Sequence, residues 1–178
     1  RRLADELEIP VALPVHESTW EIAESQARHG ARPLDRLLRL GFASPLLVAV
    51  HGTCLSPADI DALAACGAAV VHCPESNLKL GSGVCPAADL LGRGVRVALG
   101  TDGAASNNDL DVLSEMRTAG LLAAGVSARP GALVARDGDS RRILLVTSAF
   151  NVFALPFISM IPVIGSERLN LSAGWIGA

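Results

Sequence analysis

Short apolar runs alternate with longer amphipathic stretches along the first 128 residues. Four runs have the length of a buried strand: Val11–Val15, Leu46–Val50, Ala68–Val71 and Val95–Leu99. Apolar residues recur at helical spacing over Thr19–His29, Pro33–Leu40, Pro57–Cys66 and Pro86–Arg93, and from Asp109 to about Leu122. This alternation predicts an α/β fold with four parallel strands.

The pattern changes near the C-terminus. Ile143–Ser166 contains no charged residue, and Arg141 and Arg142 precede it as a cytoplasmic flank would. Its length matches the roughly 20 apolar residues that span a bilayer, so we favour a transmembrane helix. A buried soluble helix and a pair of short core strands are the alternatives. The expected division is a partial barrel over 1–128, a linker over 129–142, and a hydrophobic helix with its tail over 143–178.

Composition narrows the class of protein. The chain has 178 residues, which is short for an eight-stranded α/β barrel of about 250 residues, so we expect only part of such a barrel. A net charge of −3 and an aromatic content of 3% argue against a nucleic-acid partner. The four cysteines form no CxxC pair, which favours reduced thiols and a cytoplasmic location.

Polar residues follow each of the four predicted strands. They are His16-Glu17, His51, His72 with the segment 74–77, and Thr101-Asp102-Gly103. The carboxyl ends of parallel strands form the active-site face of α/β barrels. One histidine at a strand end is usually structural, but four such endings together favour a functional site.

Two long motifs carry a resemblance to a known family. HCPESNLKLGSG covers 72–83 and LGTDGAASNNDLDVLSEMRTAGLLA covers 99–123. From about Ile9 to Ala124 the chain resembles the amidohydrolase superfamily, in the branch of methylthioadenosine/S-adenosylhomocysteine deaminases and chlorohydrolase-like triazine hydrolases. The resemblance implies the C-terminal half of a metal-dependent (β/α)8 barrel. It also implies zinc and a hydrolase that displaces an amino or chloro group from a heteroaromatic ring, acting on non-peptide C–N bonds.

The resemblance assigns roles to particular residues. Asp102 resembles the metal-binding aspartate that also takes a proton from water, and Glu17 resembles the acid/base residue that protonates a ring nitrogen. His51 resembles the histidine that steadies the attacking hydroxide or the substrate, and we also count it with Asp102 in the metal set. Glu17, His51, Ser76 and Asn77 are the expected substrate-binding residues. Each role has a structural alternative. For Asp102 it is an acid in a turn, for Glu17 a carboxylate at a helix N-terminus, and for His51 a buried, hydrogen-bonded histidine. For Ser76 and Asn77 it is shaping a loop.

The chain departs from the family in its metal ligands. Pro14 stands where the family has a metal-binding histidine, three residues before the glutamate. The resemblance places the start of the chain near the fifth strand of the barrel, so the HxH pair of the first strand is also absent. A catalytic zinc needs about three protein ligands, and we therefore expect weak or absent zinc. His16 is an alternative ligand, because alternation along the strand places it on the same face as Pro14.

Three functions compete. The first is a fragment of a metal-dependent heterocycle deaminase, and the second is a catalytically inactive amidohydrolase-like domain. The third is a membrane-transporter piece with an appended soluble segment, because 141–178 resembles part of a major facilitator superfamily transporter. The expected partner is a small heteroaromatic substrate, with adenine nucleosides, guanine and chlorotriazines all compatible. Membrane contact through 143–166 and an oligomer through unpaired strand edges stay open.

Overall fold

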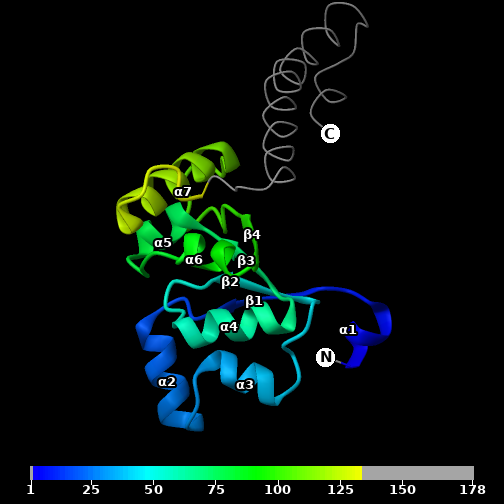
Figure 1. The fold of residues 1–178 in the computed structure, drawn as a ribbon. Helices are drawn as coiled ribbons and strands as arrows, with labels where there is room; N and C mark the ends of the chain where they lie inside the picture. Colours follow the sequence, from blue (N-terminus) through cyan, green and yellow to red (C-terminus); the bar gives the residue numbers. More distant parts are fainter. Residues whose placement is uncertain (1, 134–178) are drawn as a thin grey trace, which may run out of the picture. The chain divides into compact units, whose positions relative to one another are not determined.

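The structure is a computed structural model that describes residues 2–133. Within these residues four parallel strands form one sheet (Figure 1). The strands are β1 (Val11–Val15), β2 (Leu47–His51), β3 (Ala69–His72) and β4 (Arg96–Leu99). They are hydrogen-bonded in the order β1-β2-β3-β4, and every pair is parallel. The predicted fold class and strand order are confirmed.

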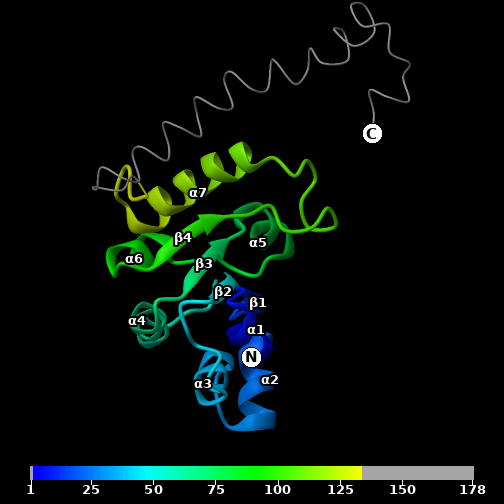
Figure 2. The same cartoon turned by 90° about the vertical axis from the view of Figure 1, so that its right-hand side faces the viewer.

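Helices follow the strands along the sheet. They are α1 (Arg2–Leu7), α2 (Thr19–His29), α3 (Pro33–Arg39), α4 (Pro57–Cys66), α5 (Pro74–Leu80), α6 (Ala87–Gly92) and α7 (Val112–Ser127). The helices α2 and α3 lie near β1, whereas α6 and α7 lie beside β4 (Figures 1 and 2). This succession is that of one side of an α/β barrel.

One helix was not predicted, and the start of another was wrong. The helix α5, which begins at Pro74, is absent from the elements expected from the sequence. The last helix starts at Val112, not at Asp109, because the Asn107 side chain accepts the backbone N–H groups of Asp109 and Leu110 and holds them in a turn. Asp111 then caps α7 by accepting the N–H of Leu113 at 2.9 Å.

The core lies between the sheet and its helices. In β2 the side chains of Leu47 and Ala49 are buried, while Val48 and Val50, on the opposite face, are half-buried. This alternation is expected for a strand with one covered face. The buried apolar residues of the core include Val15, Leu34, Leu47, Ile60, Leu63, Val70, Leu90 and Val95.

The other face of the sheet is more open. Pro14 pairs in register with Val50, which pairs with Val71, which pairs with Ala98. The outer members of this row, Pro14 and Ala98, are both exposed. Within the described residues β1 and β4 are edge strands, so the sheet forms part of a barrel wall and not a closed barrel.

The predicted hydrophobic helix lies outside the described residues. Contacts divide the chain into units 1–133 and 134–178, and the second unit is not described. No helix within residues 2–133 has the length and apolar character needed to cross a bilayer. The expected domain boundaries and the transporter resemblance of 141–178 therefore stay predictions.

Candidate active site

Three of the polar strand-end residues adopt a left-handed backbone conformation. The φ angles are 55° at His16, 73° at His51 and 61° at Asp102. Residues other than glycine rarely adopt this region, and such strain is kept mainly where the surroundings demand it. The backbone therefore turns sharply just after β1, at the end of β2 and shortly after β4.

Glu17 and His51 face each other across the ends of β1 and β2. Glu17 Oε2 lies 3.6 Å from His51 Nε2, and the Glu17 side chain is 28% exposed. His51 Nδ1 lies 3.0 Å from the side-chain nitrogen of Asn77 on α5, and both of these residues are buried. The arrangement links a carboxylate, an imidazole and an amide in one row.

Local hydrogen bonds hold the backbone around Glu17. Its N–H donates to Glu21 Oε2 at 2.7 Å, while Ser18 caps α2 by accepting the N–H of Glu21. The Thr53 hydroxyl donates to the Glu17 carbonyl oxygen at 2.6 Å. Its oxygen also lies 3.0 Å from the carbonyl oxygen of Ser82, so Thr53 ties the loop after β1 to the loop after α5.

Asp102 is held by two hydroxyl groups. Its Oδ2 accepts hydrogen bonds from Ser76 Oγ at 2.7 Å and from Ser106 Oγ at 3.0 Å. The Ser76 bond is the main cause that lowers the pKa of Asp102; burial opposes it, and Ser106 and the nearby His51 add to the lowering. Asp102 is therefore ionised at neutral pH and can accept a proton.

The helix α5 joins the two halves of the site. Its neighbouring residues Ser76 and Asn77 bond Asp102 and His51, so Glu17, His51 and Asp102 belong to one cluster at the carboxyl end of the sheet. Ser76 and Asn77 are both 0% exposed. Their predicted contact with substrate is untested, and in this structure their side chains bond the other site residues.

His16 is not available as a metal ligand in this structure. Its Nε2 accepts the backbone N–H of Leu34 at 3.1 Å, and its Nδ1 lies 3.1 Å from Arg32 Nη2 and 3.5 Å from Asp59 Oδ2. The left-handed φ breaks the alternation that was expected to place His16 on the face of Pro14. The ring packs at the start of α3 and has a structural role.

Sequence reasoning missed a buried carboxylate on α7. Glu115 is 0% exposed, and its two oxygens accept the Glu75 N–H at 3.1 Å and Asn107 Nδ2 at 2.6 Å. Glu75 in turn accepts the hydroxyls of Ser114 and Thr118. Burial raises the pKa of Glu115. Through Glu115, the helix α7 thus fixes α5 and the loop that carries Asp102. In the sequence, the only signal for Glu115 was its position within the motif 99–123.

His72 completes the set of strand-end groups. It is 1% exposed, and burial, with a smaller effect of the neighbouring His51, lowers its pKa to about 4. Its Nδ1 has no hydrogen-bond partner among the described residues. His72 is therefore neutral at physiological pH and adds no charge beside His51.

The described residues do not form a metal centre by themselves. No group of three or more His, Cys, Asp or Glu side chains within residues 2–133 is arranged to hold an ion. Pro14 has no donor atom, and His51 has both ring nitrogens near other side chains. Asp102 alone cannot meet the roughly three protein ligands of a catalytic zinc.

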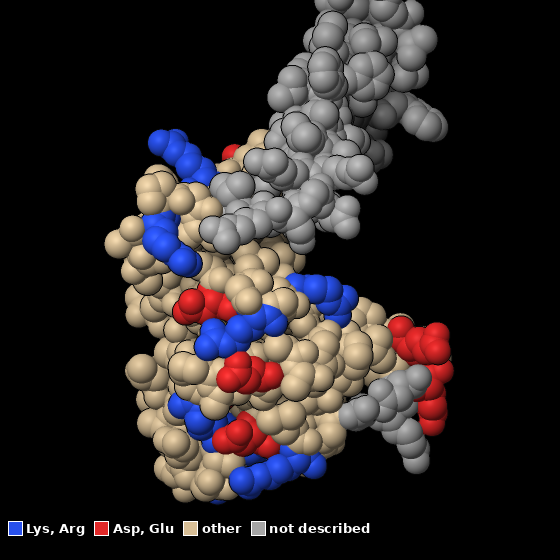
Figure 3. Space-filling view, in the orientation of Figure 1, with Lys and Arg blue, Asp and Glu red and all other residues tan. Residues whose placement is uncertain are grey.

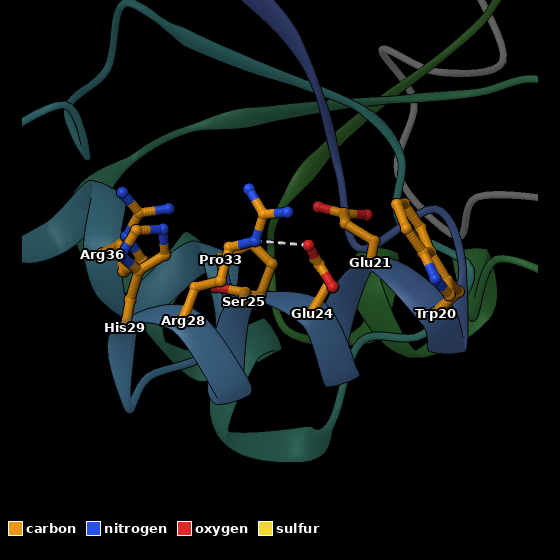
Figure 4. Close-up of a pocket in the computed structure, with 8 residues that line it drawn as sticks. All are labelled: Trp20, Glu21, Glu24, Ser25, Arg28, His29, Pro33 and Arg36. Carbon is orange, nitrogen blue, oxygen red and sulfur yellow. Dashed lines mark ion pairs between the residues drawn. The ribbon is translucent and has the colours of Figure 1, made fainter.

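A surface pocket lies apart from this cluster. Residues of α2 line it together with Pro33 and Arg36 of α3, and Glu24 and Arg28, both on α2, form an ion pair at its edge (Figure 4). None of its lining residues is one of the predicted site residues. On the face drawn in Figure 3, acidic and basic side chains are interspersed. Among the described residues, Asp61 of α4 pairs with Arg93, which follows α6, at 2.8 Å. We assign no function to either feature.

A parallel α/β sheet with a carboxylate and histidine cluster at its carboxyl edge is typical of part of an α/β-barrel enzyme. A profile of the amidohydrolase family matches residues 1–147. The chain belongs to the amidohydrolase family. The match continues beyond Ala124, where the resemblance in the sequence was expected to end.

Relatives lie in the expected branch. The chain is 49% identical to a 5-methylthioadenosine/S-adenosylhomocysteine deaminase of Saccharophagus degradans over 74% of this chain and 29% of the relative. It is 46% identical to a 5'-deoxyadenosine deaminase of Methanothermobacter thermautotrophicus over 85% of this chain and 36% of that one. The chain thus spans about a third of the length of these curated relatives.

Solved structures agree with this assignment. An adenosine deaminase from Xanthomonas campestris with bound zinc has a TM-score of 0.73 and 55% identity, over 75% of this chain and 30% of that chain. An atrazine chlorohydrolase from Arthrobacter aurescens complexed with zinc has a TM-score of 0.65 and 27% identity, over 67% and 26%. The predicted family, its deaminase and triazine hydrolase branch and the partial barrel are confirmed. The cytoplasmic location, membrane contact and an oligomer stay predictions.

Proposed function

We propose that this chain provides the proton-transfer side of an active site that hydrolytically deaminates an adenine nucleoside. The observation that carries the proposal is the cluster of Glu17, His51 and Asp102 at the carboxyl ends of β1, β2 and β4. The adenosine-type deaminases reported above share 46–55% identity with this chain, whereas the atrazine chlorohydrolase shares 27%. Deamination is therefore favoured over dechlorination.

Each residue of the cluster has a distinct task in this proposal. Glu17 gives its proton to a ring nitrogen, which makes the neighbouring carbon easier to attack. It takes a proton back from the hydroxyl of the adduct when Asp102 passes its proton to the amino group, which leaves as ammonia. His51 presents a ring N–H toward the Glu17 carboxylate and the attacking oxygen. Asp102 accepts a proton from the attacking water, and Ser76 keeps its carboxylate ionised and oriented.

We propose that zinc binds this chain weakly or not at all. Zinc is present in the related structures, where Asp102 would correspond to a ligand, but the described residues do not fit a complete site. Elemental analysis of the purified chain after dialysis is the direct measurement. Tight binding of one zinc per chain, lost in Asp102→Ala, would contradict the proposal.

A second candidate is an amidohydrolase-like domain without catalysis, and Pro14 is the observation that favours it. To separate the two, the N-terminal part of the Saccharophagus degradans deaminase is co-expressed with this chain, and ammonia release from 5'-methylthioadenosine is measured. We expect release with Pro14→His and not with Ala12→His, which adds a histidine on the same open face of β1. We call the co-expressed pair the hybrid. If the hybrid with Pro14→His folds but releases no ammonia, the result supports the inactive domain.

A further inference from the structure

The contact between Asn77 and His51 is more specific than a general packing contact. Asn77 Nδ2 lies 3.0 Å from His51 Nδ1, and the other ring nitrogen, Nε2, lies 3.6 Å from Glu17 Oε2. We infer that Asn77 is a positioning residue that keeps the ring proton of His51 on Nε2, so that His51 is a hydrogen-bond donor in the site and not a metal ligand. The catalytic meaning of this inference rests on the proposed function, but the proton position does not.

The two neighbours of the ring favour the same tautomer. A neutral imidazole has one N–H and one lone pair, so one nitrogen donates and the other accepts. A carboxylate such as Glu17 only accepts, which favours a proton on Nε2. An amide NH2 group only donates, which favours the lone pair on Nδ1. Turning the amide to present its oxygen would move the proton to Nδ1 and leave the Nε2 lone pair facing the carboxylate.

Burial makes this choice effective. His51 is 4% exposed and Asn77 is 0% exposed, so bulk water does not compete readily for either nitrogen. The Asn77 backbone is fixed in the first turn of α5, where its N–H donates to the Cys73 carbonyl oxygen at 3.0 Å. The Asn77 Oδ1 atom is buried without a hydrogen-bond partner among the described residues, so the hydrogen bond that the structure gives this amide is the one between Nδ2 and His51.

The inference revises the expected metal set. With a proton on Nε2 and an amide donor on Nδ1, neither ring nitrogen of His51 offers a lone pair to an ion. The remaining ionisable groups near the ring are Glu17, Asp102 and the neutral His72. His51 can then donate its Nε2–H to Glu17 or to an oxygen that attacks a substrate ring. Of the predicted ligands, only Asp102 is left in that role.

Nuclear magnetic resonance of the full chain labelled with 15N tests the proton position directly. Ring-nitrogen shifts of His51 are measured at about pH 8, where an ordinary imidazole is neutral, and are assigned with His51→Gln. We expect Nε2 to carry the proton, and a scalar coupling through the hydrogen bond between Asn77 Nδ2 and His51 Nδ1. Asn77→Asp replaces the donor by an acceptor of the same size and should place a proton on Nδ1.

The matched control is Asn108→Asp. Asn108 is exposed and accepts a hydrogen bond from Lys79 at 2.7 Å, so this change should leave the His51 signals unmoved. A wild-type ring protonated on Nδ1, or an unchanged ring in folded Asn77→Asp, would overturn the inference. If Asn77→Asp does not fold, the wild-type coupling decides, and its absence counts against Asn77. A hybrid with the expected tautomer that releases no ammonia would contradict the proposed function alone.

Discussion

Replacing Asp59 by asparagine tests how the loop that carries Glu17 is held. Asp59 Oδ2 accepts hydrogen bonds from Arg32 Nη2 at 2.8 Å and from the Ser56 N–H and hydroxyl, each at 2.7 Å, and it lies 3.5 Å from His16 Nδ1. His16 directly precedes Glu17. The substitution keeps the size of the side chain but removes its charge, so it leaves Arg32 without its carboxylate partner.

The magnitude follows from burial. The side chain of Asp59 is 5% exposed and that of Arg32 is 26% exposed. Removing one partner of a buried ion pair costs about 3–5 kcal/mol, and the partial exposure of Arg32 lets water recover some of this. We expect Asp59→Asn to lower the free energy of unfolding by about 2–4 kcal/mol. The control on the same helix is Asp61→Asn, whose side chain is 66% exposed in its pair with Arg93 and should cost less than about 1 kcal/mol.

Urea unfolding of the full chain followed by circular dichroism measures both variants. With a slope of about 2 kcal/mol per molar, the Asp59→Asn midpoint should fall by about 1–2 M. Burial opposes ionisation of Asp59, but the bonds from His16, Ser56 and Arg32 outweigh it and hold its pKa well below the usual value. Its contribution is therefore full above the unfolded pKa of about 4 and is lost only as the pH falls further. Equal midpoints for the two variants, or a difference that already narrows between about pH 7 and 5, would refute the reasoning.

Three further outcomes are expected. In an active hybrid, Glu17→Gln should lower kcat about 10²–10⁴-fold with unchanged zinc content, since it removes a proton carrier, and zinc loss would make Glu17 a ligand. Gly100→Ala should cost about 1–3 kcal/mol in urea unfolding because the new Cβ would lie 2.9 Å from a γ-methyl group of β3. Its control, Gly92→Ala, meets no atom within 4 Å and should not destabilise. Glu115→Gln places an amide against two donors, so amide hydrogen exchange should quicken in α5 and the loop after β4 but not in α2.

Local signals explain which elements the sequence could predict. The bounds of α4 were predicted because Ser56 caps its first turn, Pro57 starts it, and Gly67 ends it at a φ of 69°. The helix α5 has only seven residues and no side-chain cap, so its Pro-Glu-Ser start looks like a turn. Its first turn is held by Glu115, which is 40 positions away along the chain. No local pattern contains that contact.

The candidate site likewise has features that the sequence could predict and features that it could not. Polar residues after parallel strands could be placed at one edge of the sheet from the sequence, because topology alone brings strand ends together. Their partners could not be predicted. The sequence predicts a substrate contact for Asn77 but not its buried contact with His51, and it offers His16 as a ligand without its contacts to Leu34 and Asp59. Both differences depend on side-chain burial, which periodicity does not determine.

Pro14 in β1 lies at a position that the fold tolerates, and it lies outside the contacts that join Glu17, His51 and Asn77. Within the described residues β1 is an edge strand, and a proline there removes a backbone donor at little cost. The row of Glu17, His51 and Asn77 is built by contacts from α2, β2 and α5, and Pro14 takes part in none of them. A histidine at position 14 would therefore add a donor atom without a contact to Glu17, His51 or Asn77. It follows that Pro14→His should alter metal binding while leaving the His51 tautomer unchanged. One substitution therefore separates metal binding from the position of the proton on His51.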